Sequence, residues 1–518
     1  MGESTGKTGA RIWAAVAGVV SGAVFVAAAE ITAFLVARDA SPLLAAGSFV
    51  IDIVPQWAKE LAIELFGAND KLFLLLTLGV GVLLLAAVAG LLERRRRWAG
   101  VAVFALAGVA GLLATVTRAG ASGASALPPL VGAIAGCTFL TLSIRALHRW
   151  RVPAAGVEAG PDRRRFLALT AVGAAAAVLA GVGARLGTAA TTSIAAARKA
   201  LRLPEPLSRV TVPAGAELDI PGLSPLFTPN ADFYRVDTAL SVPAIAPADW
   251  RLTVDGMVGR KVELSFDELL RMGLREYAVT LTCVSNQVGG DLVGTARWLG
   301  VPVREILSRA LPAKGADMVL SRSIDGFTAS TPLDALTDPH RDAILAVAMN
   351  GEPLPPEHGF PVRMVVPGLY GYVSATKWLT RLTVTTFEKD QAYWTPRGYS
   401  AQAPIKLSSR IDTPRIDKEI PPGAARIAGV AWAQTVGIAR VEVQIDQGPW
   451  QTATLSAPVS DDTWVQWFLD WNATSGSHTL VVRATDRQGR MQEQARTPIA
   501  PDGSTGWQST VVRVGTAG

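Results

Sequence analysis

The stretch "LTCVSNQVGGDLVGTARWLG", residues 281–300, decides how the second half of this chain is built. It leaves a β-rich run at residues 277–282 and enters a glycine-rich loop, and Cys283 stands at the junction. Only two cysteines occur in 518 residues. A cysteine in such a position is either a small buried apolar side chain or a thiolate ligand to a metal. The rest of the sequence has to separate these two interpretations.

The chemistry open to Cys283 is narrowed by the scarcity of histidine, because only four histidines occur in the chain. A nucleophilic cysteine needs a base, usually histidine, and no papain-type or caspase-type signature surrounds Cys283. Zinc needs three or four ligands, and no two histidines have the spacing of a helical or finger site. A disulfide with Cys137 is not expected, since that residue lies in an apolar stretch. A metal that takes one protein thiolate, with its other ligands supplied by an organic cofactor, fits this inventory.

The composition indicates that part of the chain lies in lipid, because hydrophobic residues make up 49% of the sequence. The formal net charge of +6 reflects arginines in short clusters beside apolar runs, as in "ERRRRW" and "DRRRF". This placement is typical of membrane topology signals rather than of a basic binding groove. No basic stripe interleaved with aromatic residues is present, so nucleic acid is not expected as a partner.

Long apolar runs dominate residues 1–187 and predict an N-terminal bundle of about five transmembrane helices. Each run is about long enough to cross the hydrocarbon core of a bilayer. The segment 41–67 mixes apolar and acidic residues, so an interfacial or re-entrant helix there leaves the count open by one. The predicted spans are Ile12–Val36, Leu72–Leu92, Ala99–Val116, Leu130–Leu147 and Phe166–Leu186.

The basic residues predict the orientation of these spans. With a cytoplasmic N-terminus and five spans, Lys7, Arg94–Arg97 and the arginines between 145 and 165 all face the cytoplasm, as the positive-inside rule requires. The C-terminal half then lies outside the cytoplasm. Only His148 lies in the membrane half, which therefore cannot hold a bis-histidine haem.

The last span begins with "DRRRFLALTAVG", where Arg163 and Arg164 precede Phe166 and Leu167. This resembles a twin-arginine export signal, here internal, which carries proteins that have already folded. An ordinary positive-inside cluster is the alternative. No clear cleavage site follows, so the span is expected to stay as an anchor.

The pattern of apolar and polar residues changes after the predicted spans. Residues 203–410 alternate helical runs, such as Phe266–Met272, with strand-like runs, such as Met318–Ser321, which predicts an α+β domain. Residues 411–518 alternate apolar and polar residues between turn signals, which predicts an immunoglobulin-like β-sandwich.

Two further stretches carry candidate binding residues. "HGFPVRMVVPGLYGYVSATKWL", residues 358–379, offers Arg363 and Lys377 as cations for a phosphate, among glycines that allow close backbone approach. "FTPNADFYRVDTAL", residues 227–240, adds further polar and basic side chains. Taken singly, each stretch fits an ordinary charged surface better than a binding site.

In this order, "FTPNADFYRVDTAL", the Cys283 stretch with "ARWLGVPV", "HGFPVR" with "KWL" and a β-sandwich resemble the sulfite-oxidase family of molybdopterin oxidoreductases. The resemblance covers about 300 residues and is closest to the bacterial, membrane-anchored branch. It implies a molybdenum–molybdopterin cofactor, a location in the bacterial plasma membrane with the catalytic domain extracytoplasmic, and dimerisation through the sandwich.

The resemblance also implies roles for particular residues. Cys283 would be the catalytic residue and the one protein sulfur on molybdenum, a soft ligand suited to such a centre. His358 and Arg363 keep the spacing at which the family contacts the pterin and its phosphate. The implied cofactor-binding residues are Asn230, Tyr234, Arg235, Arg297, Ser323, His358, Arg363, Ser374, Thr376 and Lys377.

One departure limits the substrate. Sulfite oxidases place an arginine soon after the cysteine to bind the anionic substrate, whereas this chain has Gln287 and no cation there. The methionine-sulfoxide-reducing branch depends on a separate haem membrane subunit, which this membrane half does not replace.

The sequence therefore predicts an oxidoreductase that performs two-electron chemistry, by oxygen-atom transfer, and exchanges electrons with a redox protein or quinone. Membrane lipid is the other expected partner. A cofactor-free binding or assembly module is one alternative, and a membrane sensor with the soluble part as receptor is another. Almost no ionisable residue lies within the spans except Glu30, a lipid-edge residue or a quinone contact.

Overall fold

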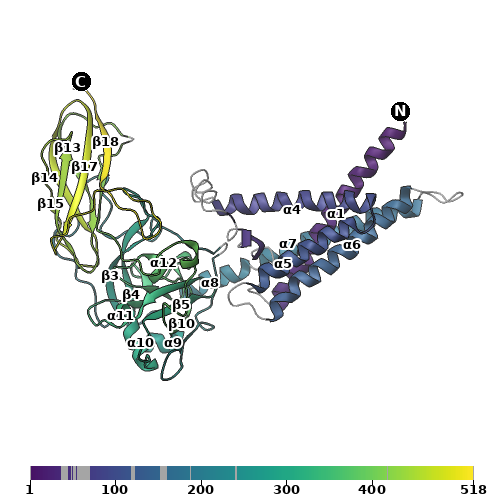
Figure 1. Cartoon of the computed structure of the whole chain (residues 1–518), viewed down its shortest axis with the longest axis horizontal. Helices are drawn as coiled ribbons and strands as arrows, with labels where there is room; N and C mark the ends of the chain where they lie inside the picture. Colours follow the sequence, from purple (N-terminus) through teal and green to yellow (C-terminus); the bar gives the residue numbers. More distant parts are fainter. Residues whose placement is uncertain are drawn as a thin grey trace. The chain divides into compact units, whose positions relative to one another are not determined.

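A computed structural model of the chain describes residues 2–36, 45–47, 49–50, 54, 70–117, 123–151, 160–186, 188–239, 242–416 and 418–516. The chain divides into two compact units, Met1–Ser193 and Ile194–Gly518. The first unit is helical, and the second contains both the α+β domain and the β-sandwich (Figure 1).

Long helices make up the described part of the first unit, and each of the five predicted spans lies within one of them (Figure 1). Phe166 of the last of these helices packs edge to face against Trp13 of the first, with ring centroids 5.7 Å apart. The elements are α1 (Gly2–Val36), α4 (Asp70–Arg95), α5 (Ala99–Val116), η2 (Gly123–Ala126), α6 (Leu127–Arg151) and α7 (Gly160–Leu186). Helix α8 (Thr188–Ala200) follows them.

Among the described residues, four segments are long and apolar enough to cross a membrane: Ala10–Val36, Leu76–Arg95, Ala99–Val116 and Gly123–Trp150. The fifth predicted span is helical within α7 but is not among these four, so its crossing stays a prediction. Most of the segment 41–67, with its predicted interfacial or re-entrant helix, lies outside the described residues.

Small residues allow α1 and α4 to pack backbone against backbone. A Cβ atom built on Gly18 would lie 2.1 Å from the carbonyl oxygen of Ala86, and one on Gly90 would lie 2.1 Å from that of Ala14. Neither position has room for a side chain. Such close approach is how membrane helices gain van der Waals contact where lipid removes the hydrophobic driving force.

Two sheets form the α+β domain, and the predicted helical run Phe266–Met272 corresponds to α9. The first sheet has the order β2 (Val262–Ser265), β1 (Arg251–Gly256), β10 (Leu379–Thr385), β5 (Met318–Ser323) and β6 (Thr328–Pro332). The second has the order β3 (Arg275–Thr282), β4 (Val293–Pro302), β7 (Ile344–Met349) and β8 (Glu352–Pro353), with β9 (Arg363–Val365) also paired to β7. The helices are α9 (Phe266–Arg271), α10 (Val303–Ala310), α11 (Leu333–Thr337), η3 (Pro356–His358), α12 (Gly371–Ser374) and η4 (Thr395–Arg397).

Strand β7 lies at the centre of this domain, because all six of its residues are buried. A strand buried on both faces reads as an unbroken apolar run, and "ILAVAM" is such a run. It pairs with β4 on one side and with β9 on the other, which places Arg363 opposite Ala346. The register of β7 therefore carries Arg363 into the interior.

The C-terminal strands form two antiparallel sheets, as the alternating sequence predicts. Their inner faces meet in a core that includes Ile427, Val441, Trp467 and Leu480. One sheet has the order β11 (Ser408–Thr413), β12 (Gly423–Trp432), β16 (Val465–Ala473) and β15 (Thr454–Leu455). The other has the order β14 (Gln451–Thr452), β13 (Ile438–Ile445), β17 (Gly476–Asp486) and β18 (Gln508–Val514).

The sandwich is hydrogen-bonded to the strand that leads to Cys283. The backbone N–H of Thr280 donates to the carbonyl of Asp462 at 2.9 Å, and the N–H of Trp464 donates to the Thr280 hydroxyl at 2.7 Å. The Trp464 indole also donates to the carbonyl of Leu226 at 2.8 Å. The end of β3 is thus fixed by both domains.

We expect Gly90→Leu to destabilise the helical unit, because the new side chain would overlap the backbone of α1. Overpacking of this kind costs about 1–3 kcal/mol, which thermal unfolding of the detergent-solubilised chain by circular dichroism would register. Gly81→Leu is the matched control, since a Cβ there meets no atom within 4 Å. Equal melting temperatures for the two variants would contradict the close packing of α1 and α4.

Candidate active site

Cys283 is the first residue after β3, at the start of the loop that returns the chain to β4. Its backbone N–H donates to the carbonyl of Leu292 at 2.9 Å, and its own carbonyl accepts from the N–H of Asn286 at 3.0 Å. The side-chain oxygen of Asn286 in turn accepts from the N–H of Leu292 at 2.9 Å. These bonds close the loop on itself and hold Cys283 at its base.

The thiol of Cys283 is buried, and burial raises its pKa. Hydrogen bonds from Ser285 and the positive charge of Lys377 lower that pKa in part. The Lys377 ammonium therefore lies within electrostatic range of the sulfur. A bound metal cation would reverse the balance, because a coordinating thiol is deprotonated outright.

The sandwich supports the far side of this loop. Ser504 donates its hydroxyl to the carbonyl of Asn286 at 2.8 Å, and Arg410 donates to the carbonyl of Gly290 at 2.8 Å. Arg410 is itself buried and paired with Asp412 at 2.6 Å. The position of Cys283 thus depends on residues more than a hundred positions away in sequence.

Arg363 is the most enclosed cation of the site, with 4% of its surface exposed. Its guanidinium donates to the carbonyl of His358 at 3.2 Å and lies over the ring of Trp298, 5.0 Å from the centroid. Burial lowers its pKa to about 10. No acidic side chain in the described part of the chain forms an ion pair with Arg363.

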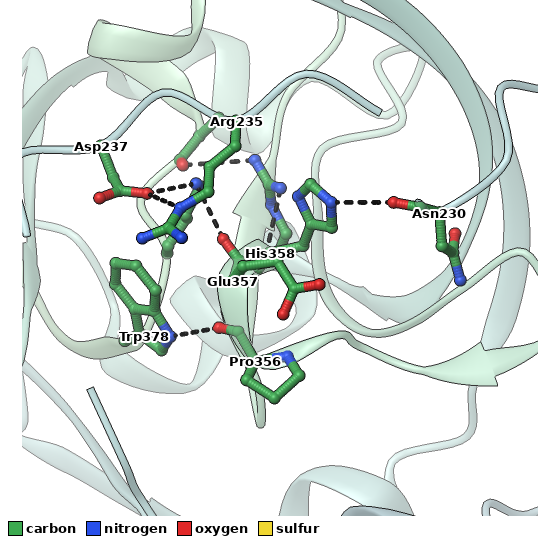
Figure 2. A network of polar contacts seen from close by, with 10 residues as sticks. Asn230, Arg235, Asp237, Pro356, Glu357, His358 and Trp378 are labelled. Atoms are coloured by element: carbon green, nitrogen blue, oxygen red, sulfur yellow. Dashed lines mark hydrogen bonds and ion pairs between the residues drawn. The ribbon is translucent and has the colours of Figure 1, made fainter. Parts of the chain in front are cut away.

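Lys377 lies beside it and shares one carboxylate with Arg235. Lys377 Nζ is 3.1 Å from Asp237 Oδ2, and Arg235 Nε is 2.9 Å from the same oxygen. Lys377 also donates to the carbonyl of Glu357 at 3.0 Å (Figure 2). Burial, followed by the charge of Arg363, lowers the Lys377 pKa to about 8, although Asp237 raises it.

His358 is neutral near pH 7, because burial and the nearby cations lower its pKa to about 3. Its Nε2 atom faces the carbonyl of Asn230 at 3.3 Å, as Figure 2 shows. A carbonyl only accepts, so Nε2 carries the ring proton and Nδ1 is left as an acceptor. That Nδ1 atom is buried and has no hydrogen-bond partner.

Buried polar atoms without partners gather among the predicted cofactor residues. They are Arg297 Nε, Ser323 Oγ, His358 Nδ1 and Arg363 Nε. Each such atom costs about 1–3 kcal/mol when it stays unpaired. Lys377 and Arg235 share one carboxylate, and Arg363 has none in the described part of the chain, so this set fits an anionic ligand that has both hydrogen-bond donors and acceptors. A molybdopterin with its phosphate has these properties.

Asn230 and Arg297 are linked by Asn350, which the sequence interpretation missed. The Asn350 side chain donates to Asn230 Oδ1 at 2.9 Å and accepts from the backbone N–H of Arg297 at 2.9 Å. Its φ of 52° is in the left-handed region, where asparagine is tolerated. The signal in the sequence is the "NG" pair at 350–351, a turn dipeptide.

Asp237 is the second functional residue that the sequence interpretation missed, although it lies within the quoted stretch 227–240. The same stretch carries Tyr234, whose ring stacks on Phe233 with centroids 5.3 Å apart. Burial and the Cys283 thiol raise the Tyr234 pKa, so its phenol stays protonated. Arg235 is partly exposed and faces Asp237.

The remaining predicted residues lie behind the cations. Ser374 donates its hydroxyl to the carbonyls of Leu369 and Tyr370 at 3.0 Å, and the Thr376 hydroxyl pairs with Ser321 at 2.7 Å. Both hydroxyls therefore have protein partners, and these two residues fix the course of the backbone into Lys377. Direct contact with a cofactor through these hydroxyls stays a prediction.

Other kinds of site find little support in the described residues. No group of three His, Cys, Asp or Glu side chains there could hold a metal ion, and Cys137 and Cys283 are both free thiols. An open cavity of about 560 Å³, lined in part by Asp317, Arg341 and Phe387, includes none of the predicted site residues. Cys283 and the buried cations are therefore the candidate site in the described part of the chain.

The lowered pKa of Lys377 predicts a pH dependence of stability in cofactor-free protein. The unfolded chain keeps this proton up to about 10.5, whereas the folded chain loses it near 8. Between these values the unfolded state binds more protons, so raising the pH favours folding, by on the order of 3 kcal/mol over the window. Denaturant unfolding at several pH values would measure this.

Lys377→Met should remove this rise in the free energy of unfolding between about pH 8 and pH 10.5, because the group that titrates is lost. Lys389→Met, at an exposed position, should keep the rise. A rise of equal size in the Lys377→Met variant would show that its source is another group.

Comparison with known proteins identifies related domains and enzymes. Residues 239–394 match the family model described as an oxidoreductase molybdopterin binding domain. Sulfite oxidase of Gallus gallus is 31% identical over 320 residues, which cover 52% of this chain and 69% of that enzyme. The match covers 58% of mitochondrial sulfite oxidase of Homo sapiens, again at 31% identity, so the chain spans little more than half of that relative.

Two further matches are more distant. NADH nitrate reductase of Solanum lycopersicum is 28% identical over 309 residues, which cover 47% of this chain and 34% of that enzyme. The solved structure of a sulfane dehydrogenase from Paracoccus pantotrophus covers 61% of this chain and 90% of its own, at 22% identity and a TM-score of 0.49. By its identity and coverage against the Gallus gallus enzyme, the chain belongs to the sulfite oxidase family of molybdopterin oxidoreductases, and its molybdopterin-binding domain implies a molybdenum–molybdopterin cofactor.

Proposed function

We propose that this chain is a membrane-anchored molybdenum enzyme in which Cys283 is the one protein ligand to the metal. The reaction is a two-electron conversion of a small substrate by oxygen-atom transfer. The catalytic domain lies on the extracytoplasmic side of a bacterial plasma membrane, and the electrons pass to or from a separate redox protein or quinone.

One observation carries this proposal: the buried Cys283 thiol lies within electrostatic range of buried Lys377, beside buried Arg363, and in the described residues Asp237 is the one carboxylate paired with these two cations. The charge of Lys377 lowers the pKa of the Cys283 thiol, and the charge of Arg363 lowers the pKa of Lys377. A cofactor-free binding module or sensor would leave Arg363 Nε and His358 Nδ1 buried and unpaired, at about 1–3 kcal/mol each. A bound anionic cofactor removes that cost.

The protein residues position the cofactor and control its surroundings. When bound, the cofactor supplies the two-electron redox chemistry. Arg363 and Lys377 would neutralise its phosphate, while neutral His358 accepts a hydrogen bond at Nδ1. The protonated Tyr234 phenol is a donor close to Cys283. The loop bonds around Cys283 keep the sulfur in place while the cofactor changes oxidation state.

The substrate is not specified by the residues that follow Cys283. Gln287 is exposed and uncharged, so the loop offers no cation for an anionic substrate at that position. We therefore do not propose sulfite as the substrate. A screen of oxidants and reductants with artificial electron dyes, on protein shown to contain molybdenum, would identify the substrate class.

The Cys283→Ala substitution should abolish turnover, because it removes the thiolate, while Arg363 and Lys377 still retain the cofactor. Three measurements test this: dye-linked activity, molybdenum per chain, and the number of sulfur scatterers around molybdenum by X-ray absorption, which should fall by one. Cys137→Ala is the matched control and should behave as wild type. Full activity in the Cys283→Ala protein would end the ligand assignment.

We also propose that the soluble part crosses the membrane already folded, through the twin-arginine signal at residues 163–167. Support comes from the cofactor, since it has to be inserted before export. Replacing Arg163 and Arg164 with lysine should leave the C-terminal part inside the cell, protected from protease added to spheroplasts. The same change at Arg95 and Arg96 is the control. Unchanged protease access in the Arg163/Arg164 variant would point to another export route.

A further inference from the structure

A cavity of about 180 Å³ lies at the arginine-rich end of α4 and α6, well apart in sequence from the catalytic residues. The turn between α4 and α5 lines one side of it, and α6 lines the other. The end of α4 contributes Arg94, the turn contributes Arg97 and Trp98, and α6 contributes Ile144, Arg145 and His148. The volume is far larger than one water molecule needs.

Glu93 holds the turn that lines the cavity. Its two carboxylate oxygens accept from the backbone N–H groups of Trp98, Gly100 and Val101 at 3.0–3.2 Å. Trp98 has a φ of 74°, and a Cβ on Gly100 would lie 2.1 Å from the Ala89 carbonyl oxygen. The shape of the turn is therefore built in and does not depend on its exposed side chains.

The buried Glu93 carboxylate accepts its hydrogen bonds from these backbone groups and does not pair with an arginine of the cavity. The cavity lining therefore carries excess positive charge. Within the described residues, Arg94, Arg97 and Arg145 have no carboxylate partner. Trp98 is 55% exposed beside them, and the Arg97 guanidinium lies 5.1 Å from its ring centroid. A shaped cavity with two more positive than negative charges, and histidine besides, needs an anion.

We propose that this cavity binds the phosphate headgroup of an anionic phospholipid from the leaflet on the arginine-rich side. Guanidinium groups match phosphate oxygens bidentately. Tryptophan is enriched at the headgroup level of a bilayer. Basic pockets between membrane helices are suited to such headgroups. The inference rests on α4, α5 and α6 lying in a membrane, which their length and apolar composition support. It does not rest on the proposed enzyme activity.

The test uses the full-length chain in detergent, with bound lipid counted by native mass spectrometry during titration with phosphatidylglycerol. Arg97→Gln combined with Arg145→Gln should weaken binding about tenfold or more, because two charge-assisted contacts are lost. Arg95→Gln combined with Arg96→Gln removes the same amount of charge, at the end of α4 and in the turn after it, yet neither residue lines the cavity. That control pair should change the affinity less than about twofold.

Several results would overturn the proposal. Equal losses in the two pairs would show a diffuse charged surface instead of a site. Phosphatidylcholine binding as tightly as phosphatidylglycerol would remove the need for an anionic lipid. Displacement of the lipid by millimolar inorganic phosphate would make a soluble anion the occupant.

A charge-conserving pair keeps the test valid if the glutamine pair does not insert correctly. Arg97→Lys combined with Arg145→Lys preserves the topology signal but loses the planar fork, so binding should weaken severalfold. Wild-type affinity in this lysine pair would contradict recognition by the guanidinium groups.

Discussion

Buried positive charge with too few carboxylates is the constraint on which the catalytic half depends. Arg363 and Lys377 are removed from water, and Asp237 alone supplies a formal negative charge to Lys377. Desolvating a charge costs several kcal/mol even after local relaxation. Backbone carbonyls of His358 and Glu357 recover part of that cost. The remainder is available to a ligand, so the same feature that weakens the cofactor-free fold provides the affinity for an anionic cofactor.

The geometry of the site is shared between two domains. The α+β domain supplies the thiol and the cations, while the sandwich holds the thiol's loop through Ser504 and Arg410. The sandwich also binds the end of β3 through Asp462 and Trp464. As the proposed metal ligand, the thiol would have to be held within about half an ångström of its productive position. Support from two sides of the loop meets that demand better than a free hairpin end.

The helical unit follows other rules. Lipid gives no hydrophobic reason for helices to associate, so α1 and α4 rely on the backbone contact that Gly18 and Gly90 permit. At the arginine-rich end, a buried glutamate shapes the α4–α5 turn, and three arginines that line the cavity have no carboxylate partner among the residues that the structure describes. Here too, uncompensated positive charge next to a cavity suggests an anionic ligand, and the chemical surroundings suggest a lipid.

Hydrophobic patterning in the sequence by itself determined the helical first half, the α+β region and the sandwich, because burial imposes a period on every helix and strand. The family motifs also placed Cys283, His358, Arg363 and Lys377, whose residue types are fixed by the chemistry they would perform. The positions of Asp237, Asn350, Ser504 and Arg410 were decided only by the tertiary structure. Lys377 meets Asp237 across 140 positions, and Ser504 meets Asn286 across 218. Such contacts depend on strand register and domain packing, which no local pattern in the chain records. For Ser374 and Thr376 the sequence motif predicted their place near the cofactor site. The tertiary structure shows that their hydroxyls hydrogen-bond to other protein groups.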